Sequence, residues 1–208
     1  MGIATCQETD KAAIMAHLFP KIPTIKYTAI CGYFGSLYVG RGINLIERLA
    51  NRHPTVGFLV IGGNPADSAA YRKNSRQNIY FIRHLKHPIA QLAMSACDVL
   101  LMPYQRSVSI GVRKHDTAQW MSPIKMFEYL ASGTPIISSD LPSLREILKD
   151  GVNALLVSPD DEDAWSKALD RLIENPELAK QIGNQGHRDY AARHTWTHRA
   201  RAMLEALA

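Results

Sequence analysis

The stretch Asp98-Val99-Leu100-Leu101-Met102 decides the fold class of this 208-residue chain. Its apolar residues follow one another without polar alternation, which is typical of a strand that is buried on both faces. Such strands occur in parallel sheets that helices cover on either side. The stretch therefore predicts an α/β protein.

Further short apolar runs, bounded by Gly, Pro or Asp, lie on both sides of this stretch and alternate with helical segments. Together with it, they predict strands at residues 27–33, 56–61, 78–82, 98–102, 135–138 and 154–157. Helices are predicted at 43–51, 89–95, 123–132, 143–149, 162–174, 176–193 and 197–207. This alternation predicts a Rossmann-like, doubly wound parallel sheet of about six strands.

The N-terminal segment lacks this regular pattern. Residues 1–26 carry only a short apolar stretch, which Pro20 and Pro23 follow, and proline breaks a helix. We expect this segment to be a tail or a linker remnant. Residues 27–208 are expected to form a single domain.

Composition excludes several classes of protein. The chain is 46% hydrophobic and 21% charged, as is usual for a soluble globular domain. It has no apolar stretch approaching the ~20 residues that a transmembrane helix needs, and no secretory signal, so a cytoplasmic location is the default. The net charge of +5 suits anionic partners such as nucleotide phosphates or an anionic membrane face. Its basic residues are dispersed rather than clustered with aromatic residues, which argues against nucleic-acid binding.

The cysteines and histidines indicate neither disulfides nor a metal site. Cys6, Cys31 and Cys97 are odd in number and form no C-x-x-C pair, and Cys31 and Cys97 are predicted to be buried thiols. His84 and His87 flank a predicted turn and are too isolated to indicate metal ligation. We expect no metal.

The topology predicts where a ligand binds. In the common strand order 3-2-1-4-5-6, the ligand crevice lies beyond the carboxyl ends of the first and fourth strands. The loops that follow these strands are residues 34–42 and 103–122. These loops are therefore the first places to look for site residues.

The first loop, Phe34-Gly35-Ser36-Leu37-Tyr38-Val39-Gly40-Arg41-Gly42, has the composition of a phosphate site. Its glycines let the backbone approach a phosphate closely, and the helix that follows offers free N–H groups. Arg41 can add a charged, bidentate contact. A flexible turn with a surface arginine is the alternative interpretation.

The second loop leads into a well-specified helix. Ser122 is a plausible N-cap, Pro123 suits the first helical position, and Gly133 fits the position after the helix. Lys125, in the first turn, is a candidate for a diphosphate contact, and Glu128 can accept hydrogen bonds from ribose hydroxyls. A surface Lys125–Glu128 pair is the alternative.

The segment from Ser122 to Glu146, SPIKMFEYLASGTPIISSDLPSLRE, closely resembles the C-terminal domain motif of the group 1 glycosyltransferases. These are retaining enzymes of the GT-B fold. Residues 35–46, 98–103 and 150–157 also match, and the resemblance spans residues 27–205. It implies that the chain is one half of a GT-B fold and binds a nucleotide sugar.

The resemblance also implies roles for particular residues. Glu128 would bind the donor ribose, Arg41 would contact the diphosphate, and backbone groups around Arg83 and His84 would meet the base. The site predicted in this way, from the loops and the resemblance together, comprises Gly35, Ser36, Gly40, Arg41, Arg83, His84, Trp120, Met121, Ser122, Ile124, Lys125 and Glu128. Arg41 and Lys125 are the candidate catalytic residues, because they would offset negative charge on the departing diphosphate.

Two site positions depart from the family pattern. Trp120 stands where many members have a Glu placed against the donor sugar, so the backbone of Met121 and Ser122, or Lys125, would supply that contact. Arg41 stands where the family usually has a Lys, so the positive charge is kept but the shape of the charged group differs.

The activity implied is transfer of a sugar, with retention, from a nucleoside diphosphate sugar to a saccharide or lipid-linked acceptor. No cofactor beyond this donor substrate is implied. The family's N-terminal acceptor domain has no counterpart in the sequence, so it would be separate or missing. The setting implied is polysaccharide biosynthesis, in the cytoplasm or at the inner face of the membrane. A non-catalytic nucleotide-sugar-binding subunit of a split or truncated glycosyltransferase is the alternative.

Overall fold

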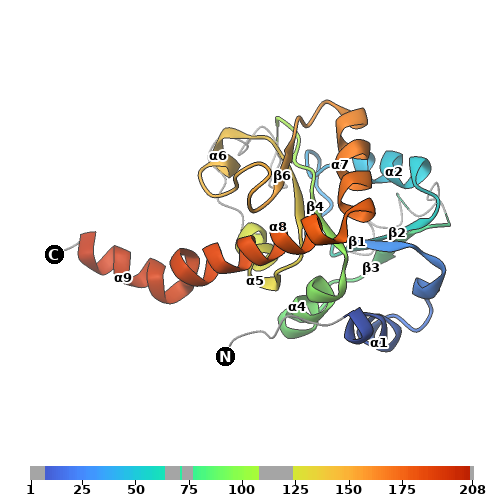
Figure 1. The fold of residues 1–208 in the computed structure, drawn as a ribbon, viewed down its shortest axis with the longest axis horizontal. Helices are drawn as coiled ribbons and strands as arrows, with labels where there is room; N and C mark the ends of the chain where they lie inside the picture. The colour runs from blue at the N-terminus through green and yellow to red at the C-terminus, as the bar shows by residue number, and fades with distance from the viewer. Residues whose placement is uncertain (1–7, 64–70, 72–76, 108–123, 207–208) are drawn as a thin grey trace.

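The computed structural model describes residues 8–63, 71, 77–107 and 124–206. In Figure 1, six parallel strands form the centre of the molecule. They are β1 (Ala29–Phe34), β2 (Val56–Ile61), β3 (Ile79–Ile82), β4 (Val99–Met102), β5 (Ile136–Ser139) and β6 (Leu155–Val157). Their order across the sheet is β3-β2-β1-β4-β5-β6. The predicted Rossmann-like, doubly wound sheet is confirmed, with its first and fourth strands side by side.

Helices cover both faces of this sheet. They are α1 (Glu8–Leu18), α2 (Ile43–Arg52), α4 (His87–Ala96), α5 (Ile124–Ser132), α6 (Pro142–Arg145), α7 (Glu162–Glu174) and α8 (Pro176–Asp189). A further helix, α9 (Trp196–Ala206), extends away from the sheet (Figure 1). A short 3₁₀ turn, η1 (Thr24–Lys26), precedes β1, and a π-helical turn, η2 (Tyr190–His194), joins α8 to α9. Figure 1 shows α2 and α7 together on one side of the sheet, with α1 and α4 on the other.

The strands are buried on both faces because their side chains alternate between two cores. On β1, Cys31 and Tyr33 pack with residues of α2 and α7, whereas Ile30 and Phe34 pack with residues of α4 and α5. All six residues of β1 are buried, as the apolar runs predict for a covered parallel sheet. Cys31 and Cys97 are buried free thiols, as expected, and Cys6 lies outside the described residues.

The N-terminal segment differs from the tail that we expected. Residues 8–18 form α1, which packs on α4. Met15 and Phe19 belong to the core on that face of the sheet, with 2% and 6% of their surface exposed. The Lys11 ammonium lies 3.3 Å from the Asp98 carboxylate, directly before β4. Residues 8–19 are therefore part of the packed domain, while a division of the chain at residue 26 stays a prediction.

Two further helices differ from their predicted bounds. The helix expected at 143–149 ends at Arg145, and Asn153 holds the following segment in a turn. The Asn153 side chain accepts a hydrogen bond from the Lys149 N–H at 2.7 Å and donates one to the Ile147 carbonyl at 3.1 Å. The helix expected at 176–193 becomes π-helical from Tyr190. In the described parts of the chain, no helix has the length and apolar character to cross a membrane.

Candidate functional site: two buried cations at the strand ends

The loops after β1 and β4 touch at the carboxyl ends of these two strands. The Gln105 N–H donates to the Gly40 carbonyl at 2.8 Å. Gly42, with φ of 80°, lies so close to Pro103 that a Cβ atom would stand 1.8 Å from the Pro103 carbonyl oxygen. Only glycine fits a left-handed position with this close approach. These contacts join the two loops at the place where the strand order predicts a ligand.

Gly35 makes room for a lysine in the same place. A Cβ atom on Gly35 would stand 2.7 Å from Lys125 Nζ. The Gly35 N–H also donates to the Ile61 carbonyl at 2.8 Å, which fixes the start of the loop at the end of β2. The glycine-rich loop therefore lies against the first turn of α5.

Tyr129 fixes α5 in this position. Its buried hydroxyl accepts a hydrogen bond from the Phe34 N–H of β1 at 2.8 Å and donates to the Leu101 carbonyl of β4 at 3.4 Å. Since Lys125 lies one helical turn before Tyr129, this double contact places Lys125 at the ends of both strands.

Lys125 and Arg41 meet around two buried tyrosines. Lys125 Nζ lies 3.9 Å from the centre of the Tyr33 ring and 5.0 Å from the centre of the Tyr104 ring. The Arg41 guanidinium carbon lies 5.1 Å from the centre of the Tyr104 ring, and Arg41 Nη1 donates to the Tyr104 hydroxyl at 3.0 Å. These ring faces are favourable neighbours for cations.

Neither cation has a hydrogen-bonded counter-ion among the described residues. Part of each side chain is accessible, but Lys125 Nζ and Arg41 Nε are buried and make no hydrogen bond there. Burial lowers the pKa of Lys125 well below the usual lysine range, and the charge of Arg41 lowers it further, against the opposing effect of Glu128. Buried charges are normally paired. The arrangement is therefore electrostatically prepared for an anion.

Glu128 has a partner that the sequence does not indicate. His87, the first residue of α4, donates from Nε2 to Glu128 Oε1 at 3.0 Å. The Glu128 side chain is 24% exposed and that of His87 is 63% exposed. Glu128 thus lies at the edge of the site, with one carboxylate oxygen engaged by an imidazole.

The remaining predicted residues fall into three groups. Ser36 lies in the glycine-rich loop, and its carbonyl accepts a hydrogen bond from the Tyr33 hydroxyl at 2.7 Å. Arg83 and His84 are exposed and directly follow β3, and Ile124 is 59% exposed at the start of α5. The predictions for Trp120, Met121 and Ser122 lie outside the described residues.

The structure thus brings together Gly35, Arg41 and Lys125, with Glu128 nearby, and adds three residues that sequence reasoning missed. Tyr33 and Tyr104 contact the cations, and His87 contacts Glu128. A signal for the tyrosines was present, because each lies at the carboxyl end of a strand that borders the predicted crevice.

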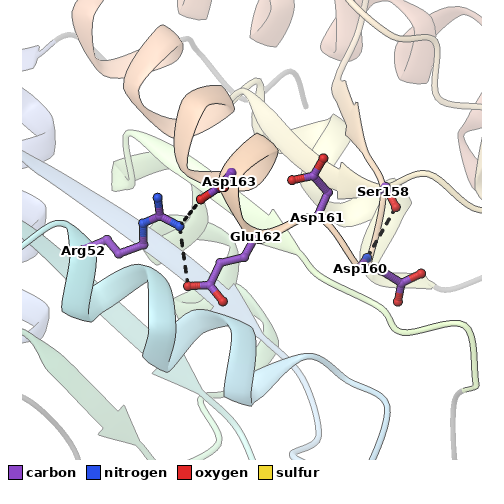
Figure 2. A pocket seen from close by; sticks show the side chains of 6 residues that line it. All are labelled: Arg52, Ser158, Asp160, Asp161, Glu162 and Asp163. Carbon is purple, nitrogen blue, oxygen red and sulfur yellow. Dashed lines mark hydrogen bonds and ion pairs between the residues drawn. The ribbon is translucent and has the colours of Figure 1, made fainter.

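A hollow outside this site, seen in Figure 2, lies between the end of α2 and the start of α7. It is lined by Arg52, Ser158 and the acidic run from Asp160 to Asp163. Arg52 Nη1 lies 2.6 Å from Asp163 Oδ1 and 3.7 Å from Glu162 Oε1. The lining holds four carboxylates and one guanidinium, and this excess of negative charge disfavours a phosphate here. Within the described ranges, no group of three His, Cys, Asp or Glu residues is placed to hold a metal ion.

Comparisons with known proteins agree with the fold. Residues 41–205 match the family described as glycosyl transferase-like. A D-inositol 3-phosphate glycosyltransferase of Stackebrandtia nassauensis is 35% identical over 163 residues, which are 74% of this chain and 33% of that protein. A phosphatidyl-myo-inositol mannosyltransferase of Mycolicibacterium smegmatis is 27% identical over 134 residues, 64% of this chain and 32% of that protein. The chain spans about a third of the length of these two relatives.

Two solved structures share the architecture. Anabaena Alr3699/HepE, in complex with UDP and glucose, superposes with a TM-score of 0.75 at 16% identity, over 94% of this chain and 52% of that one. The C-terminal domain of LpcC, a group 1 glycosyltransferase family protein from Francisella tularensis, superposes with a TM-score of 0.63 at 21% identity, over 85% of this chain and 90% of that one. The chain therefore belongs to the glycosyl transferase-like family and has the fold of the C-terminal half of a group 1, GT-B glycosyltransferase.

Proposed function

We propose that this chain is the donor-binding half of a retaining glycosyltransferase, and that it holds a nucleoside diphosphate sugar with the diphosphate against Arg41 and Lys125. One observation carries the proposal. Lys125 Nζ and Arg41 Nε are buried side-chain nitrogens without a hydrogen-bond partner in the described part of the chain. A diphosphate supplies both the negative charge and the acceptor oxygens that this pair lacks.

The position of the cations supports the same ligand. They lie beyond the carboxyl ends of β1 and β4, where the winding of the sheet reverses and where doubly wound folds bind nucleotides. HepE, which shares the fold, has a structure in complex with UDP-glucose. A nucleotide placed in this way has its ribose near Glu128 and its base near Arg83 and His84. The donor sugar would then lie toward Trp120, Met121 and Ser122.

The cations have a chemical role in the proposed reaction. Negative charge grows on the diphosphate as its bond to the sugar breaks, and preorganised positive charge stabilises that transition state. Arg41 supplies a permanent charge. Lys125 supplies a charge that the diphosphate itself favours, since a nearby anion raises the pKa of a buried ammonium. The step proposed here needs no metal ion.

The acceptor is proposed to be a saccharide or a lipid-linked sugar, held by a facing acceptor domain. The two relatives are a glycosyltransferase named for an inositol phosphate and a mannosyltransferase named for an inositol lipid, which supports such acceptors. A cytoplasmic setting, at or near the inner face of the membrane, and a part in polysaccharide biosynthesis go with this proposal.

Titration calorimetry tests the proposed function. The 208-residue chain is titrated with UDP, GDP, ADP and dTDP, and with the corresponding nucleosides. We expect one diphosphate to bind more tightly than its nucleoside, and Lys125→Met, which keeps the chain length but removes the ammonium, to reduce that difference. If no diphosphate binds to the folded chain, the proposed function is wrong.

A further inference from the structure

Two tyrosines lie in contact with the cation pair and are almost completely buried. Tyr33 is the fifth residue of β1, Tyr104 follows β4 by two residues, and each is 1% exposed. Each ring presents its face to Lys125, at 3.9 Å and 5.0 Å from ring centre to Nζ. The Tyr104 ring also faces the Arg41 guanidinium at 5.1 Å. One ring thus touches both cations, and the other touches Lys125.

The hydroxyl groups hold these rings in place. Tyr33 donates a hydrogen bond to the Ser36 carbonyl at 2.7 Å, which ties its ring to the glycine-rich loop. Tyr104 accepts a hydrogen bond from Arg41 Nη1 at 3.0 Å. Burial raises the pKa of both phenols, more than Arg41 lowers it, so both remain neutral. Neutral, fixed rings can stabilise the cations through their faces without neutralising them.

We propose that Tyr33 and Tyr104 are positioning residues that hold the Lys125 side chain beside Gly35 and the Arg41 side chain beside Tyr104 while the site is empty, so that both side chains are in place when a diphosphate arrives. This inference rests on the proposed function, because it assigns to the tyrosines the preparation of that same site. The tyrosines act through the two cations and are not assigned a contact with the substrate.

The physical reason lies in the cost of ordering a long cation. A lysine side chain loses considerable rotamer freedom when it is fixed, and two like charges held together repel each other. A carboxylate partner would offset both costs, but it would also compete with the diphosphate for the cations. Ring faces offset part of the cost through cation–π attraction. They leave the Lys125 ammonium and the Arg41 Nε–H available for phosphate oxygens.

Leucine and phenylalanine variants separate this role from simple packing. Tyr33→Leu and Tyr104→Leu remove the ring faces, whereas Tyr33→Phe and Tyr104→Phe keep them. The probes are UDP and uridine, or whichever diphosphate and nucleoside the wild-type chain binds best, and inorganic pyrophosphate as a probe without a base. Tyr27→Leu is the control, because Tyr27 precedes β1 at the opposite end of the sheet.

We expect each leucine variant to bind the diphosphate and pyrophosphate about 5- to 30-fold more weakly, with nucleoside affinity unchanged. Tyr33→Phe should lose less affinity than Tyr33→Leu, since it lacks only the hydrogen bond to the Ser36 carbonyl. Tyr104→Phe should lose less than Tyr104→Leu, since it lacks only the Arg41 hydrogen bond. Tyr27→Leu should match the wild type.

Four results are diagnostic. Equal losses of affinity for diphosphate and nucleoside, or equal losses in the phenylalanine and leucine variants, would overturn the inference. The tyrosines would then contribute only to packing. Unchanged diphosphate binding in folded leucine variants would overturn it as well. A wild-type chain that binds no diphosphate would instead overturn the proposed function. Thermal unfolding checks that each variant folds. If Tyr33→Leu does not fold, Tyr33→Met replaces it, because methionine also lacks a ring and its unbranched side chain adapts to the space.

Discussion

The imidazole of His87 and the carboxylate of Glu128 are joined by a hydrogen bond of 3.0 Å between α4 and α5. The bond occupies one of the two carboxylate oxygens that the proposed ribose contact uses. A nucleotide that binds through Glu128 therefore competes with His87 for this side chain.

His87→Ala should therefore strengthen nucleoside diphosphate binding, because the ribose no longer displaces the imidazole. The gain should be at most about fivefold, since exposed ion pairs contribute roughly 0–1 kcal/mol. Calorimetry at constant pH and salt measures it. Glu128→Ala should weaken binding by roughly 1–3 kcal/mol, and by more in the His87→Ala background than in the wild type. Weaker binding by His87→Ala would show that His87 itself contacts the ligand.

Gly35→Ala should weaken diphosphate binding because the new methyl group would stand only 2.7 Å from Lys125 Nζ and displace the ammonium. Gly151→Ala is the matched control. Gly151 also has a positive φ, at 69°, but a Cβ there meets no atom within 4 Å. Both variants should lose stability through backbone strain, as thermal unfolding will record, but only Gly35→Ala should lose affinity. Equal affinities of the two variants for the diphosphate would show that Gly35 is not part of the binding site.

Lys125 makes both stability and binding depend on pH. The pKa of Lys125 is lower in the folded chain than in the unfolded chain. Between these two pKa values the unfolded chain binds more protons than the folded chain, so stability rises with pH. The destabilisation by Lys125 is complete below the lowered pKa, and it disappears as the pH rises to the ordinary lysine pKa. Denaturant titrations should show that Lys125→Met is more stable than the wild type at neutral pH, with a smaller gain at high pH.

A diphosphate raises the pKa of Lys125 again, so binding above the lowered pKa should take up a proton. Calorimetry in Pipes and in Tris, whose ionisation enthalpies differ, gives the number of protons taken up. We expect uptake by the wild type to exceed uptake by Lys125→Met, and affinity to fall as the pH rises. The same proton number in both proteins would contradict the role given to Lys125.

The sequence predicts the sheet well, because each strand is a short apolar run between chain breakers and the apolar faces of the sheet must be buried by helices. It also indicates the place of the cations, since Arg41 and Lys125 each lie near the carboxyl end of a strand bordering the crevice. It does not predict α1, whose few apolar residues precede two prolines. That helix is held by tertiary packing of Met15 and Phe19.

The partners of the site residues depend on contacts between distant segments. His87 and Glu128 are 41 residues apart, and Arg41 and Tyr104 are 63 residues apart. No local pattern encodes these distances, so the sequence predicted only that His87 flanks a turn, and it gave no role to Tyr104. Buried tyrosines at strand ends become informative only when the strand order is known.

The 208-residue chain alone should bind a nucleoside diphosphate sugar but transfer the sugar negligibly. Positioning of donor and acceptor can supply ~7–11 kcal/mol of barrier reduction, and the residues assigned here position only the donor. Sugar transfer and donor hydrolysis are measured with the purified chain, candidate donors and acceptors, and again after addition or fusion of a cognate acceptor domain. Rapid transfer by the chain alone would contradict the half-site proposal. No transfer after fusion to the cognate domain would favour a non-catalytic binding subunit.

If Arg41 and Lys125 hold a diphosphate, loss of the guanidinium in Arg41→Ala should weaken the contact with the phosphates and spare the contact with the nucleoside. Calorimetry compares the wild type and Arg41→Ala with a nucleoside diphosphate and with its nucleoside, at low and high salt. A diphosphate held by the two cations means that Arg41→Ala weakens diphosphate binding more than nucleoside binding, because the lost contact is charge-assisted, and that high salt narrows the difference between the two losses. Equal losses for the two ligands in a folded variant would contradict it.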